Sequence, residues 1–325
     1  MTTNLRTFLK TIFAAISLAA ASAALAQAWP SKPVTVIWPY PPGGSASEVK
    51  MRALYNEAGR VLGQPFVWDY KPGAGARLGV AAVMKGPTDG HLYSFATDTL
   101  LTVLAQTSAS FNAQVERDYI PVHMPYGIAL VTTAHPKLPF KDLKGWVAYA
   151  KANPGKLSFG STGLGGTAHL ASERIAAALG IQMLHVPYVG QPFQTDMLNG
   201  TIDIMTFTTT SLAPHINSGK LVGLVQTGSR RAGALQNVPT MKESGTDVVI
   251  ETWNAIVAPP GTPMEIVNKL NATLTAALKA PEVNKLFVQD ESLLFSQTPK
   301  EIVEVIKADT ERVKPIIQRM NLKFD

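Results

Sequence analysis

Hydrophobic positions recur along this chain in short runs, and each run leads into a helical pattern. Residues 34–38 are almost entirely apolar, which is typical of a strand buried on both faces. Two glycines follow, and the spacing after them predicts one apolar helix face made of Leu54, Ala58, Val61 and Leu62. Residues 66–69 and 92–96 read as further strands. This alternation predicts α/β units around a mostly parallel sheet.

The same rhythm restarts in the middle of the chain. A helix is predicted over residues 143–152, and a later one shows Ala171, Ile175, Ala178 and Leu179 on one face and stops at Gly180, a left-handed cap. The predicted strands of this second sheet are residues 128–133, 157–160, 183–187, 202–207 and 221–227.

Two helices near the C-terminus open with the motif Thr-Pro-x-Glu. In each, the threonine can cap the helix, the proline suits the first helical position, and the glutamate can complete a capping box. The capping threonines are predicted to be Thr262 and Thr298, with Glu265 and Glu301 as their partners.

The first 26 residues have the composition of a secretory signal peptide. Arg6 and Lys10 precede an apolar run, and Ala24-Leu25-Ala26 forms a small-residue cleavage site. The chain contains no cysteine, so it has neither a disulfide nor a lipid-anchor cysteine. We therefore expect cleavage after Ala26 and a soluble periplasmic protein.

Charge argues against a nucleic-acid partner. The formal charge of +6 falls to +4 when Arg6 and Lys10 leave with the signal peptide, and the remaining basic residues are scattered. A mild preference for small anionic molecules fits this balance better.

Gly-rich turns follow three of the predicted strands and suggest enzyme sites, but none carries the complete sequence motif of such a site. Gly163, Gly165 and Ala168 match a dinucleotide-binding pattern, yet no acid lies about 20 residues further on. A secreted serine hydrolase is the stronger alternative, because serines lie in strand-to-helix turns; none has the full G-x-S-x-G pattern. The candidate nucleophiles would be Ser45, Ser47 and Ser161.

The six histidines show no metal-binding spacing, so neither a metal nor a cofactor is predicted. His169 lies near the start of its helix. It could line a binding site or simply bond the backbone of a neighbouring loop.

Seven segments together resemble the Bug-type periplasmic receptors of tripartite tricarboxylate transporters. They occur in order and at matching spacing, which makes the combination specific. The segments are WPSKPVTVIWPYPPGGS, LGQPFVWDYKPGAGARLG, PTDGHLYSF, GKLSFGSTGLGGTAHL, HVPYVGQPFQTDMLNGTIDIM, LAPHINSGKL and WNAIVAPPGTP.

The resemblance implies a type II periplasmic binding protein, a Venus flytrap of two Rossmann-like lobes. It implies a monomer that catalyses nothing, closes over a small carboxylate, and delivers it to the permease subunits of a tripartite tricarboxylate transporter. Some relatives serve a sensor kinase instead. Lobe 1 would comprise residues 27–123 and 252–325, and lobe 2 residues 124–251.

The resemblance also implies that Gly-rich loops from the two lobes face each other and receive ligand carboxylates on backbone N–H groups. Helix starts suit this role, because their N–H donors are unsatisfied and the helix dipole is positive there. The Ser45 side chain would also cap the helix that follows the first loop. The expected ligand-binding residues of lobe 1 are Pro42, Gly43, Gly44, Ser45, Ser47, Ala74, Gly75, Arg77 and Thr97. Those of lobe 2 are Ser161, Thr162, Gly163, Thr167, His169, Tyr188 and Phe207.

Two of these positions depart from the family pattern. Phe207 stands where many members carry an aspartate that meets a ligand amine, so carboxylates without an amine should bind better. Arg77 stands where members have a small or amide residue. It could grip a second carboxylate, face solvent, or pair with an acid such as Asp69 or Asp98.

Overall fold

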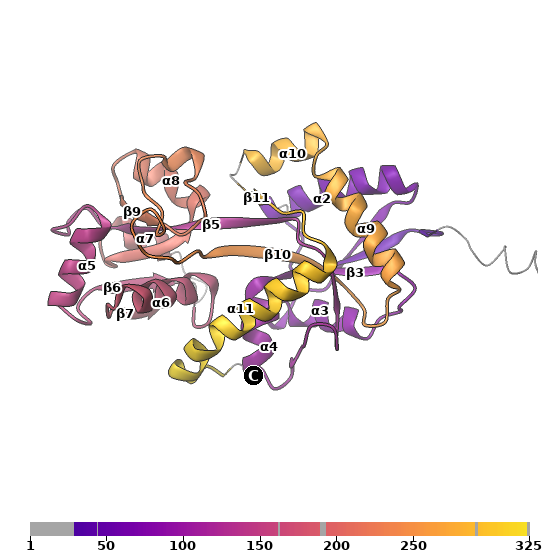
Figure 1. The fold of residues 1–325 in the computed structure, drawn as a ribbon, viewed down its shortest axis with the longest axis horizontal. Helices are drawn as coiled ribbons and strands as arrows, with labels where there is room; N and C mark the ends of the chain where they lie inside the picture. Colours follow the sequence, from indigo (N-terminus) through magenta and orange to yellow (C-terminus); the bar gives the residue numbers. More distant parts are fainter. Residues whose placement is uncertain (1–28, 44, 162, 189–192, 290–291, 324–325) are drawn as a thin grey trace, which may run out of the picture.

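Two α/β halves share one continuous sheet in the computed structural model, which describes residues 29–43, 45–161, 163–188, 193–289 and 292–323 (Figure 1). The predicted signal peptide lies outside these residues. The strand order is β2-β1-β3-β10-β5-β8-β6-β7, with β4, β9 and β11 paired beside this path.

The first half, lobe 1, is a three-layer sandwich. Its parallel strands are β1 (Val34–Trp38), β2 (Phe66–Tyr70) and β3 (Leu92–Thr97). One sheet face is covered by α2 (Ala46–Leu62), α9 (Met264–Ala277) and α10 (Pro281–Val288). The other carries α3 (Arg77–Met84), the π-helical turn η2 (Leu100–Leu104) and the first turns of α11 (Pro299–Met320).

The second half, lobe 2, repeats this layering. Its strands are β6 (Ser158–Ser161), β7 (Leu184–Pro187), β8 (Ile204–Thr208) and β9 (Val222–Gln226). Helices α5 (Leu143–Ala152) and α6 (Thr167–Leu179) cover one face. The opposite face carries α7 (Phe193–Leu198) and α8 (Thr209–Asn217).

Two long strands, β5 (Tyr126–Ala134) and β10 (Glu251–Ala258), connect the halves. They pair with each other at Ile128 and Thr252, while β10 continues into lobe 1 opposite Phe95. In lobe 2, β5 pairs with β8, and Val131 lies opposite Phe207. The short strands β4 (Ile120–His123) and β11 (Leu293–Leu294) add to β10 and β5.

These connecting strands correct the prediction of a mostly parallel, divided sheet. Parallel pairing holds among β1–β3 and among β6–β8, but every pair that involves β5 or β10 is antiparallel. The strand at 251–258 was not predicted, because its alternation is weak and its partners lie far away in sequence. Two helix positions were also wrong, since Val61 and Ala178 are exposed.

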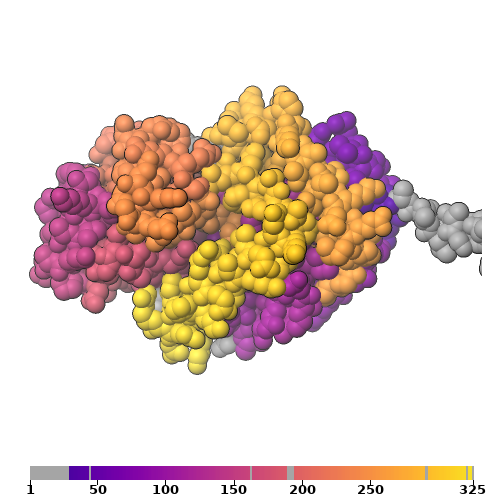
Figure 2. All heavy atoms as spheres, viewed as in Figure 1, coloured from indigo at the N-terminus to yellow at the C-terminus, as the bar shows by residue number. Residues whose placement is uncertain are grey.

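The C-terminal helix α11 lies across the front of the molecule and reaches lobe 2 (Figure 2). Leu170 of α6 packs into an apolar cluster with Val313, Ile316 and Ile317 of α11. Nearby, Arg319 donates to Glu173 at 2.6 Å. The lobes are therefore joined by this contact as well as by the two strands.

Candidate functional site

The first Gly-rich loop connects β1 to α2, and its exposed residues include Pro42 and Gly43. The Ser45 hydroxyl accepts the Glu48 N–H at 3.2 Å, which confirms Ser45 as the cap of α2. The Glu48 carboxylate accepts the Gly43 N–H at 3.4 Å. One of the backbone donors expected for a ligand therefore faces a carboxylate of the chain itself.

Glu48 is buried and belongs to a polar group that the sequence reasoning did not assign to the site. It accepts from Arg52 at 3.0 Å and from the Tyr70 hydroxyl at 2.5 Å. The Arg52 guanidinium also lies 4.3 Å from the centre of the Trp68 ring. This group fixes the first turn of α2, and the i, i+4 spacing of Glu48 and Arg52 was the available signal.

Behind this turn, Ser47 contacts the connecting strand. Its hydroxyl accepts from the Tyr126 hydroxyl at 2.8 Å. Lys50, one turn further along α2, lies 4.0 Å above the Tyr126 ring and donates to Ser292 at 3.1 Å. Sequence reasoning missed Lys50 and Tyr126, because only the fold brings β5 and β11 against α2.

The second Gly-rich turn is exposed and has an unusual backbone conformation. Four successive residues have positive φ, from Gly73 at 127° to Ala76 at 74°, and the intervening Ala74 and Gly75 are exposed. Arg77 donates to the Ala74 carbonyl and to Ser108, each at 2.7 Å. Asp69, one of its suggested partners, pairs with Lys71 instead.

At the end of β3, the lobes touch directly. Thr97 accepts the Leu100 N–H at 3.4 Å, and Thr99 lies 3.0 Å from Thr167 of lobe 2, oxygen to oxygen. Asp98 accepts the Thr99 N–H at 2.6 Å. Burial raises the pKa of Asp98 to about 6, although the bonds from Thr99 oppose this shift.

The third Gly-rich loop precedes α6 and is held by two stacked imidazoles. The rings of His169 and His185 lie 3.7 Å apart and nearly parallel. His169 Nδ1 accepts the Gly165 N–H at 2.9 Å, so neutral His169 carries its proton on Nε2. Of the two roles considered for His169, the backbone contact is thus present; His185 was missed.

Ser161 and His185 resemble a nucleophile and its base, with Oγ and Nε2 2.7 Å apart. Ser161 is fully buried, however, and its hydroxyl also bonds both the N–H and the carbonyl of Gly163. Both bonds hold the hydroxyl within its own loop. The arrangement fixes the loop, and the Gly163 N–H predicted for a ligand is directed at Ser161.

Both imidazoles are held neutral. Burial, assisted by the neighbouring His185 ring, lowers the pKa of His169 to about 4, and burial lowers the pKa of His185 to about 4 as well. A protonated His169 Nδ1 would no longer accept the Gly165 N–H. The loop geometry therefore depends on unprotonated rings.

The two aromatic residues predicted to bind ligand, Tyr188 and Phe207, lie in lobe 2 beside this loop. Tyr188 donates to Asp196 at 2.7 Å, and Phe207 lies at the end of β8. Both are half-buried against the same apolar cluster, which includes Met197 and Leu212. The remaining candidates, Gly44 and Thr162, lie outside the described residues.

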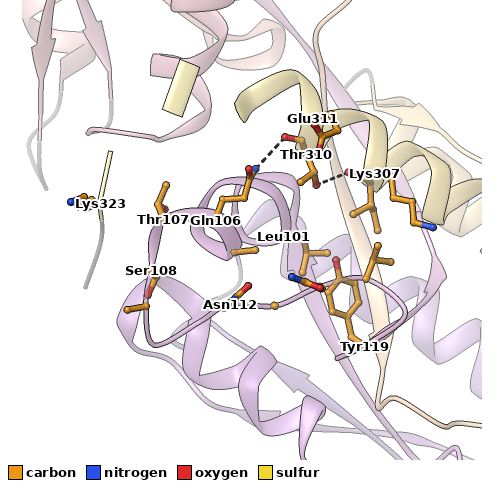
Figure 3. Close-up of a pocket in the computed structure, with 16 residues that line it drawn as sticks. Leu101, Gln106, Thr107, Ser108, Asn112, Tyr119, Lys307, Thr310, Glu311 and Lys323 are labelled. Carbon is orange, nitrogen blue, oxygen red and sulfur yellow. Dashed lines mark hydrogen bonds between the residues drawn. The ribbon is translucent and has the colours of Figure 1, made fainter. Parts of the chain in front are cut away.

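A hollow of about 940 Å³ lies elsewhere, within lobe 1 between η2, the segment at 107–115 and α11 (Figure 3). Its rim is fixed by internal bonds, such as that from Gln106 to the Thr310 carbonyl at 3.1 Å. None of the predicted ligand-binding residues lines it. We therefore base the candidate site on the Gly-rich loops.

Within the described part of the chain, no group of three or more His, Cys, Asp or Glu side chains is arranged to hold a metal ion. None of the described helices is long and apolar enough to cross a membrane.

The loops, their helix starts and the two-lobe sheet define a periplasmic binding protein. Residues 50–322 match the tripartite tricarboxylate transporter family receptor, and the chain belongs to this family. A Pseudomonas protein from the tcbD-tcbE intergenic region is 33% identical and covers 91% of this chain and 88% of its own length. BugT of Bordetella pertussis is 31% identical, covering 92% of each chain. The solved structure of a periplasmic transporter is 34% identical, with a TM-score of 0.72 over 92% of this chain and all of its own.

Proposed function

We propose that this protein captures a small carboxylate in the periplasm by closing its two lobes, and delivers it to the permease subunits of a tripartite tricarboxylate transporter. The contact between Thr99 and Thr167 supports this proposal best, because it brings the start of α6 in lobe 2 against lobe 1. Helix starts favour anionic groups. The family assignment supports a membrane transporter as the partner.

We propose the same lobe boundaries as the sequence resemblance implies. We assign residues 27–123 and 252–325 to lobe 1, and residues 124–251 to lobe 2, so that the chain crosses between the lobes just before β5 and at the start of β10. The protein works as a monomer after cleavage at Ala26. It performs no chemistry, since the serine best placed to act as a nucleophile is buried and bonded to its own loop.

Carboxylate binding should be visible as stabilisation against heat. Ligand at 100 times its Kd stabilises the folded state by about 2.7 kcal/mol, which raises Tm by several degrees for a chain of this size. Differential scanning fluorimetry with mono- and dicarboxylates, without metal or nucleotide, measures this. Protein confirmed by native mass spectrometry to be ligand-free serves as the reference. No shift with any organic acid would contradict the proposal.

A further inference from the structure

A small cavity of about 210 Å³ lies between the lobes, at the start of α8. Thr209, Arg230 and Gly233 line it from lobe 2. Val288, the last residue of α10, and Ser292, directly before β11, line it from lobe 1. None of the ligand-binding residues predicted from the sequence belongs to it.

Two residues that line the cavity connect it to the two sides of the candidate site. On the lobe 1 side, Ser292 bonds Lys50, which lies one helical turn after Ser47 in α2. On the lobe 2 side, Thr209 follows two residues after Phe207, where β8 ends. The cavity therefore lies at the edge of the same inter-lobe region as the first Gly-rich loop.

Thr209 supplies a buried polar group without a partner. Its residue is only 1% exposed, and its hydroxyl makes no hydrogen bond among the described residues. A buried hydroxyl left unpaired is unfavourable, and an acceptor that reached it from this cavity would relieve that cost. Thr209 is also the first residue of α8, whose start has no side-chain cap. The first-turn N–H groups of this nine-residue helix add a positive potential.

Arg230 supplies the charge. It is exposed, and its guanidinium makes no hydrogen bond or ion pair within the described ranges. The neighbouring Arg231 differs, because it pairs with Glu243 at 2.8 Å and donates to the Gln236 carbonyl. Glu251 accepts from Ser229 rather than from Arg230. A guanidinium of this kind suits a carboxylate, which it can bind with two parallel hydrogen bonds.

We propose that this cavity binds a second carboxylate of the solute, held by Arg230 and by the Thr209 hydroxyl at the start of α8. The inference rests on the proposed function and narrows its substrate class to dicarboxylates. One carboxylate lies at the Gly-rich loops and the other in this cavity. It assigns to Arg230 the role that the sequence suggested for Arg77, which bonds Ser108 and the Ala74 carbonyl.

Calorimetry on two matched pairs of acids tests the proposal: succinate against butyrate, and adipate against hexanoate. Arg230→Gln should weaken the dicarboxylate that binds best by tenfold or more, and change the affinity for its monocarboxylate less than twofold. Thr209→Val, which keeps the side-chain volume, should weaken the dicarboxylate several-fold. Lys220→Gln removes an exposed charge beyond the opposite end of α8 and should leave every affinity within twofold.

Three results would overturn the inference. In the first, Arg230→Gln binds dicarboxylates within twofold of the wild-type affinity. In the second, Lys220→Gln loses as much dicarboxylate affinity as Arg230→Gln does. In the third, the wild-type protein binds monocarboxylates as tightly as dicarboxylates. Each of these leaves the proposed function standing. If the folded wild-type protein binds none of the acids, the proposed function fails together with the inference.

Discussion

Thr298 caps α11 through both bonds of a capping box. Its hydroxyl accepts the Glu301 N–H at 3.3 Å, and the Glu301 carboxylate accepts the Thr298 N–H at 2.8 Å. Thr262 begins the same motif, but its hydroxyl donates to the Pro259 carbonyl at 2.8 Å, and α9 begins without a side-chain cap. The prediction was right for Thr298 and wrong for Thr262, because a buried tight turn takes up the second hydroxyl.

At this residue scale, Thr298→Ala should lower the free energy of unfolding by about 0.5–2 kcal/mol, since it removes the acceptor of the cap. Thr298→Ser keeps that acceptor and should cost clearly less. Chemical denaturation of the three proteins measures both values. Equal stability of the alanine variant and the wild type would show that Thr298 contributes nothing as a cap.

At the scale of elements, α6 connects the candidate site to the C-terminal helix. Thr167, Leu170 and Arg174 recur at helical spacing and meet lobe 1 at Thr99, at the α11 cluster and in a cavity beside Asp309. Because the loop at the start of α6 belongs to the candidate site, a movement of α6 against α11 would move that loop.

Leu170→Ala should therefore destabilise the protein by about 2–5 kcal/mol, the usual cost of emptying a packed leucine site. Leu184→Ala is a suitable control, because Leu184 is 59% exposed and should cost about 0.5 kcal/mol or less. Thermal and denaturant unfolding measure the difference. A Leu170→Ala protein as stable as the control would contradict a tightly packed contact between α6 and α11.

For the whole molecule, the buried His123 and His169 and the half-buried His185 make stability depend on pH. Burial lowers the pKa of His123 to about 3, and those of His169 and His185 to about 4. Since an unfolded histidine titrates near pH 6.5, the unfolded chain binds more protons below that pH. The stabilisation that comes from keeping these histidines neutral should be fully present above about pH 6.5. It should be lost as the pH decreases toward about 4.

For the well-buried His123, the loss amounts to about 2 kcal/mol at pH 5. His169 and His185 should contribute less per ring, because their pKa values are lowered less than that of His123. Asp98 acts in the opposite direction, because its raised pKa lets the folded state take up a proton below about pH 6. Hydrogen-bonded carboxylates such as Glu301, whose pKa is lowered by the bonds from Thr298, stabilise the folded state above about pH 4.5 and lose this stabilisation only as the pH falls further.

Thermal unfolding between about pH 7.5 and 4.5 measures this dependence, and NMR of the imidazole nitrogens at about pH 5.5 reports whether the rings stay neutral. We expect a steady fall in Tm and neutral rings for these three histidines. A constant or rising Tm, or charged rings in the folded protein at that pH, would contradict it.

Much of the local structure was predictable because its signals are local. The apolar run at 34–38 became β1, residues 143–152 became α5, and Gly180 ends α6 with a positive φ. The Gly-rich turns after β1, β2 and β6 could also be located, since the strand, the glycines and the helix pattern are contiguous. The family resemblance supplied the two-lobe fold that connects them.

Tertiary structure decided which groups surround those turns. Lys50 meets Tyr126, and Ser161 meets His185, only after strands far apart in sequence have paired. The same pairing brings Thr209 and Ser292 to one cavity. The partners of charged side chains are also decided by the fold. Arg77 bonds the carbonyl of its own turn and Ser108, whereas Arg230 stays exposed. Periodicity records which face of an element is apolar, whereas hydrogen bonds and charges are settled by what the folded chain places opposite that face.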